Sequence, residues 1–188
     1  MIYSYPDYYK KFRCIADKCP DTCCSDWQIV IDDESLEKYR NYAGEYRQTL
    51  HRNIQWEEGV FGHNRKGKCA FLRDDGLCDM YKHMGKDSLC TTCREYPRHT
   101  EEFENIREIS LSLSCPEVAR ILMQKTEPVT FVCEEDDEEE VFEDYDYFLF
   151  SNLEDIREEI LKITQNREES LKAVSYTHLR AHETVLDL

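Results

Sequence analysis

The sequence predicts an α+β fold: a small cysteine-rich domain of short strands and helices, followed by the start of a helical region. Nine of the ten cysteines lie between Cys14 and Cys115, so short cysteine-bearing loops dominate that part of the chain. The spacing of apolar residues also changes several times along the chain. Short runs in which every second residue is apolar, as in strands, are followed by runs with the 3–4 spacing of helices. The 188 residues are long enough to bury the core of one ordinary domain.

The first cysteine group, which runs from Cys14 to Cys24, is expected to be a loop. Pro20, Asp21 and Thr22 stand inside it and favour turns. A short strand is then predicted around Ile29, because apolar residues recur there at every second position. Asp32 and Asp33 are suited to cap a helix. That helix has the apolar positions Leu36, Tyr39, Ala43, Tyr46 and Leu50. Residues 52–67 are expected to form an irregular connection.

The second cysteine group begins with an apolar stretch over residues 69–72, and a turn is predicted at residues 74–76. A short helix should begin near Cys78 and end at Gly85. Cys90-x2-Cys93 follows, and Pro97 ends this local structure. A strand is then expected over residues 109–115, with a helix after Pro116.

A final helix is predicted from a capping box formed by Ser151 and Glu154. Its apolar stripe consists of Leu153, Ile156, Ile160 and Ile163. Little sequence remains to cover this stripe, so we expect the chain to be part of a longer protein.

Four regions follow from these patterns: a cysteine-rich domain over 1–128, an acidic linker over 129–150, the start of a truncated helical region over 151–172, and a tail over 173–188. The linker is predicted because residues 134–146 contain ten acidic side chains, which repel one another. The tail resembles a translated sequencing-adapter read-through. We therefore expect it not to belong to the natural protein.

Charge and hydropathy exclude two classes of partner. The net charge is −16, so the chain lacks the basic surplus that phosphate-driven nucleic-acid binding needs. No apolar stretch approaches the length that spans a bilayer, and the N-terminus lacks the pattern of a signal peptide. We expect no nucleic-acid partner, no membrane partner and a cytoplasmic location.

In a reducing compartment, so many cysteines indicate metal or redox chemistry rather than disulfides. Thiolates are soft ligands that suit zinc, copper(I) and iron–sulfur clusters. Cys90-x2-Cys93 has the spacing of a metal-binding knuckle. The predicted ligands are Cys14, Cys19, Cys23, Cys24, Cys69, Cys78, Cys90, Cys93 and Cys115.

The pattern leaves the type and number of sites open. Nine sulfurs suffice for two four-ligand sites, or for one cluster with structural thiols around it. The ferredoxin run and the radical S-adenosylmethionine triplet are absent, so spacing does not separate zinc from iron–sulfur. Adjacent side chains diverge, so Cys23 and Cys24 are not expected to bind the same ion. Cys133 stands apart and is expected to be a small buried residue outside the site.

Other chemistry is sparsely represented. The six glycines form no phosphate-binding loop or dinucleotide fingerprint. His51, His63, His83 and His99 are scattered and are expected to be surface or hydrogen-bonding residues. The aromatic N-terminus, residues 3–12, is expected to pack in the core or against the cysteine loop.

The ordered motifs resemble those of the flagellin lysine-N-methylase (FliB-like) family. The motifs run from Cys14…Cys19…Cys23-Cys24…Trp27, through Cys69-Ala70-Phe71-Leu72…Gly76-Leu77-Cys78 and Cys90…Cys93…Tyr96-Pro97-Arg98, to Leu111-Ser112-Leu113-Ser114-Cys115-Pro116. The cysteine cluster is also similar to the YkgJ-like zinc- or iron-chelating proteins. The resemblance covers about residues 1–125 and is expected to continue to residue 172.

This resemblance implies an enzyme that transfers methyl groups from S-adenosylmethionine to flagellin lysines, with a metal centre, an iron–sulfur cluster or alternatively zinc. A lysine must lose its proton before it attacks a methyl sulfonium. Asp21, Asp26 and Tyr96 lie near cysteines and are candidates for a base or a donor contact, without an assigned role. The alternative is a non-catalytic zinc- or iron-binding module.

Overall fold

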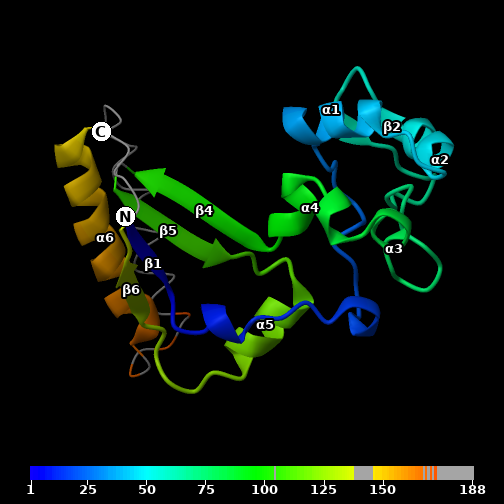
Figure 1. The fold of residues 1–188 in the computed structure, drawn as a ribbon. Helices are drawn as coiled ribbons and strands as arrows, with labels where there is room; N and C mark the ends of the chain where they lie inside the picture. Colours follow the sequence, from blue (N-terminus) through cyan, green and yellow to red (C-terminus); the bar gives the residue numbers. More distant parts are fainter. Residues whose placement is uncertain (104, 138–145, 167, 169, 171, 173–188) are drawn as a thin grey trace, which may run out of the picture.

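The computed structural model describes residues 1–103, 105–137 and 146–166, together with residues 168, 170 and 172. These residues form two neighbouring parts (Figure 1). One part contains a four-stranded sheet and two helices, and the other contains the remaining α-helices and a small hairpin. This mixture of helices and strands confirms the predicted α+β class.

The sheet has the strand order β4-β5-β1-β6. Its strands are β1 (Ile2–Pro6), β4 (Arg98–Phe103), β5 (Ile106–Leu111) and β6 (Phe131–Glu135). β1 lies parallel to β5 and antiparallel to β6, whereas β4 and β5 are antiparallel. Segments far apart in the chain therefore meet around β1, the first strand.

The strand predicted over 109–115 is shifted toward the N-terminus. The Ser112 N–H donates to the Pro97 carbonyl, and the Cys115 N–H then bonds back to the Ser112 carbonyl. This turn ends β5 at Leu111 and leads into α5 (Pro116–Met123). Pro116 occupies the first turn of α5, as predicted.

Helix α6 (Tyr147–Gln165) begins earlier than predicted. Asp146 is the N-cap, and its carboxylate accepts from the Leu149 N–H at 3.0 Å. The predicted capping box of Ser151 and Glu154 is therefore wrong, because both residues lie inside the helix. α6 contacts the sheet through the Phe150 ring, 5.0 Å from that of Phe103.

The other part begins with α1 (Asp33–Asn41) and α2 (Arg47–Arg52). The predicted single helix is broken because Tyr42 adopts an extended conformation. A hairpin of β2 (Ile54–Gln55) and β3 (Val60–Phe61) occupies part of the expected irregular connection.

Two short α-helices complete this part: α3 (Asp79–Met84) and α4 (Thr91–Glu95). Gly85 ends α3 with φ +83°, as predicted. Three 3-10 helices lie between these elements: η1 (Tyr9–Lys11), η2 (Ala16–Lys18) and η3 (Lys86–Ser88).

The strand expected around Ile29 is reduced to one bridge between Val30 and Val60. The alternation is nevertheless present in the burial of side chains. Ile29 and Ile31 are buried, whereas Val30 is 56% exposed. The segment is therefore one edge of the core without a continuous ladder.

Each part has its own hydrophobic core. The first core surrounds Tyr39, Leu50 and Phe61 and lies among α1, α2, the hairpin and the cysteine loops. The second core contains Tyr8, Phe12, Leu111, Cys115 and Val118 and lies between the N-terminal segment and α5. Burial of Tyr8 and Phe12 confirms the prediction for the aromatic N-terminus.

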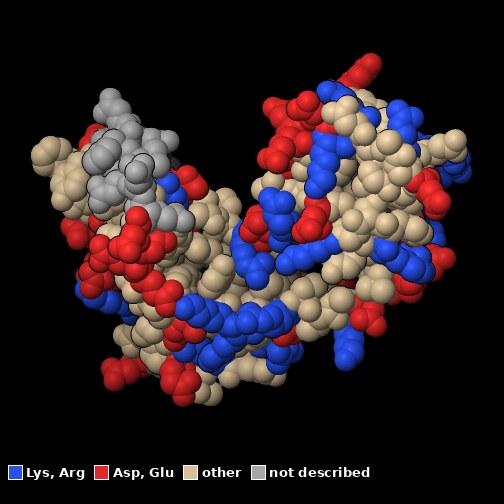
Figure 2. All heavy atoms as spheres, viewed as in Figure 1, with Lys and Arg blue, Asp and Glu red and all other residues tan. Residues whose placement is uncertain are grey.

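Figure 2 shows a hollow between the two parts, with Lys and Arg side chains gathered along its lower side in this view. Within the described residues, no helix has both the length and the apolar character needed to cross a membrane. Residues 138–145 of the acidic linker and the whole predicted tail, 173–188, lie outside the described residues.

Candidate metal centre

Several of the nine predicted ligands stand at the ends of short elements. Cys78, Cys90 and Cys115 each occupy the position directly before a helix, namely α3, α4 and α5. All ten cysteines lie in the described part of the chain, and none of them forms a disulfide. The thiols therefore remain available as ligands.

Five cysteines belong to the first core, and we call them the inner thiols. They are Cys24, Cys69, Cys78, Cys90 and Cys93. Cys69 is 4% exposed and Cys90 is fully buried. Main-chain contacts bring their loops together, since the Cys69 N–H donates to the Cys24 carbonyl at 2.8 Å. Residues 72 and 78 also form a bridge beside them.

The Cys90–Cys93 pair is anchored to the core by residues 30 and 32. The Cys90 Sγ lies 4.0 Å from the Val30 carbonyl, and the Thr92 hydroxyl donates to the same carbonyl at 2.8 Å. The Asp32 carboxylate caps α1 through the Ser35 N–H and also accepts from the Thr91 N–H at 2.8 Å. One aspartate therefore links α1 to the loop that carries Cys90.

Hydrogen bonds between thiols make their acidities unequal. The hydrogen bond from Cys93 lowers the pKa of Cys90, and the same contact raises the pKa of Cys93. A hydrogen bond from Cys23 likewise lowers the pKa of Cys24 and raises that of Cys23. Burial raises the pKa of Cys69 to about 11. Metal binding must therefore displace protons from the buried thiols.

The turn that carries Cys23 and Cys24 is held by the Cys24 N–H, which donates to the Thr22 hydroxyl at 3.1 Å.

The remaining four cysteines, which we call the outer thiols, are Cys14, Cys19, Cys23 and Cys115. Burial raises the pKa of Cys19, and the nearby thiols of Cys115, Cys14 and Cys23 act in the same direction. Cys115 belongs to the second core, whereas Cys14 and Cys23 are exposed.

An aromatic pair lies beside the outer thiols. The Trp27 and Tyr96 ring centroids are 5.8 Å apart. The Trp27 indole donates to the Cys23 carbonyl at 2.7 Å, and the Tyr96 hydroxyl lies 3.0 Å from the Ser114 hydroxyl. Burial raises the pKa of Tyr96. These anchors hold both rings next to the Cys23 and Cys115 segments.

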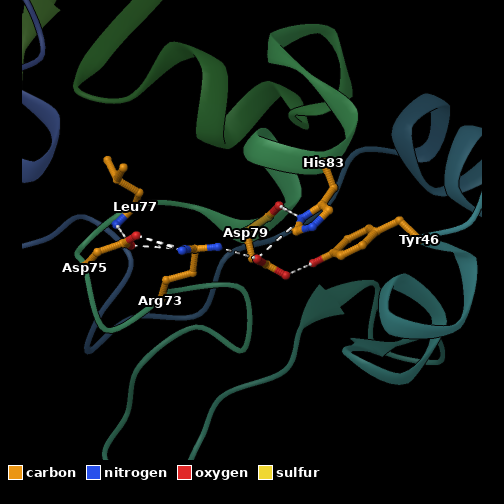
Figure 3. Close-up of polar contacts among 6 residues, drawn as sticks. All are labelled: Tyr46, Arg73, Asp75, Leu77, Asp79 and His83. Atoms are coloured by element: carbon orange, nitrogen blue, oxygen red, sulfur yellow. Dashed lines mark hydrogen bonds and ion pairs between the residues drawn. The ribbon is translucent and has the colours of Figure 1, made fainter.

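A polar network stabilises the loop that carries Cys78 (Figure 3). The Tyr46 hydroxyl donates to the Asp79 carboxylate at 2.6 Å, and Arg73 contacts both that carboxylate and Asp75. The His83 ring stacks on Tyr46 with centroids 4.7 Å apart. Hydrogen bonds from Tyr46 and Arg73 help to lower the pKa of Asp79. The network therefore ties the N-terminus of α2 to the start of α3.

His63 is a residue that pattern analysis did not assign to the site. It forms an antiparallel bridge with Cys69, so both side chains lie on the same face of that bridge. Its Nε2 atom is buried and has no hydrogen-bond partner among the described residues. The turn of residues 64–67 creates this pairing, and the sequence marks it only by a glycine at position 67, which adopts φ +74° in the structure.

The other residues considered for the site either lie away from the inner and outer thiols or make contacts with their neighbours in the chain. Asp21 accepts from the neighbouring Thr22 N–H, and Asp26 joins the turn at Gly67 through its N–H. Cys133 is exposed on β6, so the expectation that it is buried is wrong. It is exposed because β6 is an edge strand of the sheet. Among the remaining histidines, His51 contacts the Tyr39 carbonyl and His99 contacts Glu101.

The thiols are neighbours, but their sulfur atoms do not surround a common point as the ligands of one metal ion would. Within the described residues, no three Cys, His, Asp or Glu side chains are placed to hold one ion. The donor set nevertheless fits zinc or iron, because it consists of free thiols of which several are buried. Binding of a metal ion would require short shifts of the loops that carry the thiols.

Comparison with known proteins addresses this thiol cluster directly. Residues 13–115 match a family model described as "Putative zinc- or iron-chelating domain". The chain belongs to this zinc- or iron-chelating family. All nine predicted ligands fall within the matched segment, which supports metal binding.

Several relatives carry names that refer to lysine methylation or to flagellar biosynthesis. The chain is 34% identical over 127 residues to a protein named Lysine-N-methylase from Salmonella typhimurium, covering 62% of this chain and 31% of the relative. A protein with the same name from Salmonella choleraesuis gives the same identity and coverage. The "Flagellar biosynthetic protein FliU" of Salmonella muenchen is also 34% identical, over 75% of its length.

These matches confirm the suspected family resemblance. The chain spans less than a third of the length of the two Lysine-N-methylases. No solved structure matches the chain.

Proposed function

We propose that this chain is the metal-binding part of a protein-lysine N-methyltransferase that acts on flagellin. In this proposal S-adenosylmethionine is the methyl donor, and the protein works in the cytoplasm, where reducing conditions keep thiols free. The supporting observation is the gathering of nine free thiols in the segment shared with the zinc- or iron-chelating family. The names of the relatives supply the reaction and the substrate class.

The proposed ligands are the inner and outer thiols, and the proposed metal centre is an iron–sulfur cluster, with zinc as the alternative. A bound iron–sulfur cluster supplies one-electron chemistry, whereas zinc supplies Lewis acidity. Cys90 and Cys24 should lose their protons first, because each accepts a hydrogen bond from a neighbouring thiol. Burial of Cys69 and Cys90 excludes water from this side of the site.

Methyl transfer also requires contacts to cations, since the donor is a sulfonium and the substrate is a lysine. Aromatic rings attract such cations. Trp27 is 40% exposed and is held beside Tyr96 next to the outer thiols. We therefore place Tyr96 and Trp27 as the candidate contact, while the catalytic base stays unassigned.

The test is a chimera in which residues 1–125 replace the matching segment of the Salmonella typhimurium Lysine-N-methylase. Methyl-labelled S-adenosylmethionine and flagellin are added, and label on lysine is measured. We expect transfer by the chimera, loss of transfer and of metal in Cys93→Ser, and neither loss in Cys133→Ser. A chimera that is folded and metal-loaded but transfers no methyl would contradict the proposed enzyme function.

The second candidate is a non-catalytic zinc- or iron-binding module. It is favoured by the matched family description, which names metal chelation alone. The two candidates separate in the same experiment, because a module would hold metal in the chimera without supporting transfer.

A further inference from the structure

We propose that Arg98 binds the carboxylate of the methyl donor, while the rings of Tyr96 and Trp27 face the sulfonium of the same molecule. S-Adenosylmethionine carries both groups on one short amino-acid chain, so it is recognised best where an anion contact adjoins a cation contact. This inference rests on the proposed function, which assigned only the cation contact.

The Arg98 guanidinium has no anionic partner in the described part of the chain. It lies over two rings, with its central carbon 5.3 Å from the Phe12 centroid and 5.9 Å from that of Tyr9. The other partly buried arginines among the described residues, Arg73 and Arg107, contact carboxylates at 2.9 and 3.4 Å. The nitrogens of Arg98 are not enclosed by the protein. Their N–H donors are therefore left for water or a ligand.

The two rings orient this guanidinium before any ligand binds. Cation–π contact stabilises a cation over an aromatic face. The planar fork of a guanidinium matches the two oxygens of a carboxylate, and a fork that is already held in place loses little freedom on binding. Arg98 is therefore prepared for one bidentate contact.

Basic side chains around Phe12 add positive charge to this region. Lys11 and Arg13 are exposed and stand on either side of Phe12. The Arg13 guanidinium donates to the carbonyls of Lys10 and Phe12, whereas Lys10 pairs with Glu134. The segment around η1 runs along the side of the hollow where Lys and Arg side chains gather (Figures 1 and 2). An anionic group is attracted to this side.

Tyr96 brings the cation contact close to the guanidinium. It is two residues before Arg98 and packs against the second core, to which Phe12 belongs. Its ring centroid lies 5.8 Å from that of Trp27, and its hydroxyl lies 3.0 Å from the Ser114 hydroxyl. Trp27 is 40% exposed, so a ligand can reach its face. Arg98 and the aromatic pair are thus linked through the same core.

The charges favour a zwitterion over other anions. The net charge of −16 repels polyanions, but it does not repel a molecule that carries a sulfonium beside its carboxylate. An acidic residue of flagellin offers the carboxylate without an attached cation. The methyl donor is the ligand that uses both contacts.

Equilibrium binding to the complete chain, purified without oxygen, tests the carboxylate contact. The probes are S-adenosylmethionine and its decarboxylated analogue, which keeps the sulfonium. The analogue should bind about 10- to 100-fold more weakly, because it lacks the partner of the guanidinium. Arg98→Ala should abolish this difference, and Arg98→Lys, which keeps the charge without the fork, should retain part of it. The ratio of the two affinities is unaffected by a loss of folded protein.

Two further variants separate the contacts. Trp27→Ala should weaken binding of S-adenosylmethionine more than binding of S-adenosylhomocysteine, which lacks the sulfonium charge. Arg40→Ala is the matched control, because its guanidinium lies 5.6 Å from the Trp56 ring in the other part of the molecule. It should change none of the affinities.

Equal affinity of the unchanged chain for the two sulfonium compounds, or an undiminished difference in Arg98→Ala, would overturn the inference. Weaker binding of flagellin rather than of the donor by Arg98→Ala would also overturn it, because the carboxylate would then belong to the substrate. These results leave the proposed function intact, since methyl transfer by the chimera tests that function separately. A chain that binds no donor, beside a chimera that methylates lysine, would overturn the inference alone.

Discussion

At the scale of single residues, Asp32 connects α1 to the segment that carries Cys90. Its two carboxylate oxygens accept from the Ser35 and Thr91 N–H groups, so it caps α1 and holds the residue after Cys90. Burial by itself would raise the pKa of Asp32. These hydrogen bonds outweigh it and lower the pKa of Asp32 to about 2. The ionised form is therefore stabilised by folding.

Asp32→Ala should reduce the free energy of unfolding by about 2 kcal/mol, because it removes an N-cap and a second hydrogen bond. Asp32→Asn retains one acceptor and should cost about half as much. The carboxylate contributes fully above its unfolded pKa near 3.8, and this contribution is lost as the pH falls toward 2. Urea unfolding at several pH values measures both effects. Equal stability of all three proteins at pH 7 would contradict this role.

A second residue-scale prediction concerns His63. Its ring lies on the same face as Cys69, and its buried Nε2 lacks a partner among the described residues. We expect the ring to hydrogen-bond a metal-bound Cys69, so His63→Leu should weaken zinc affinity by about 10- to 100-fold. The control is His99→Leu, whose ring is exposed and contacts Glu101. Unchanged zinc affinity in competition titrations of His63→Leu would rule out this role.

At the scale of elements, the contact between Tyr46 and Asp79 fixes the N-terminus of α2 against the start of α3. Tyr46→Phe keeps the ring stacked on His83 but leaves Asp79 without that donor. The expected loss is about 1.5–3 kcal/mol in the free energy of unfolding, because the acceptor is charged. Tyr81→Phe is the matched control, since Tyr81 is 49% exposed. Equal unfolding midpoints for the two variants would show that the network adds no stability.

The elements also show how far pattern analysis reaches. Local signals predicted the Asp32 cap, the end of α3 at Gly85 and the start of α5 at Pro116, because each depends on neighbours in sequence. The strands β1, β4 and β6 escaped prediction. β4 has the sequence RHTEEF, in which apolar alternation is absent, and it is defined by its pairing with β5. Such pairing is long-range information.

In the candidate site, too, some features follow from local sequence and others depend on long-range contacts. Cysteine count and spacing singled out the nine cysteines as ligands, and that assignment stays a prediction. Which of these cysteines pack in the first core was not predictable, because that depends on how their loops fold together. The bridge between His63 and Cys69 likewise follows from a turn whose closing geometry is visible only in three dimensions.

At the scale of the whole molecule, metal removal should affect the two parts unequally. The sheet is held by strand pairing around β1, whereas the segment from Cys69 to Cys93 consists of turns and short helices. After chelation, amide exchange should become faster by on the order of tenfold in residues 69–95 and change little in β1 and β5. Hydrogen-exchange mass spectrometry measures this difference. A uniform change along the chain would show that both parts unfold together.

The central position of β1 has a consequence for synthesis of the protein. β1 leaves the ribosome before both of its partners, because β5 ends at residue 111 and β6 at residue 135. At translation rates of about 5–20 residues per second, β1 waits on the order of ten seconds for its sheet. The last inner thiol, Cys93, emerges before either partner strand. The thiols up to Cys93 are therefore exposed to cellular metal while β1 is still unpaired.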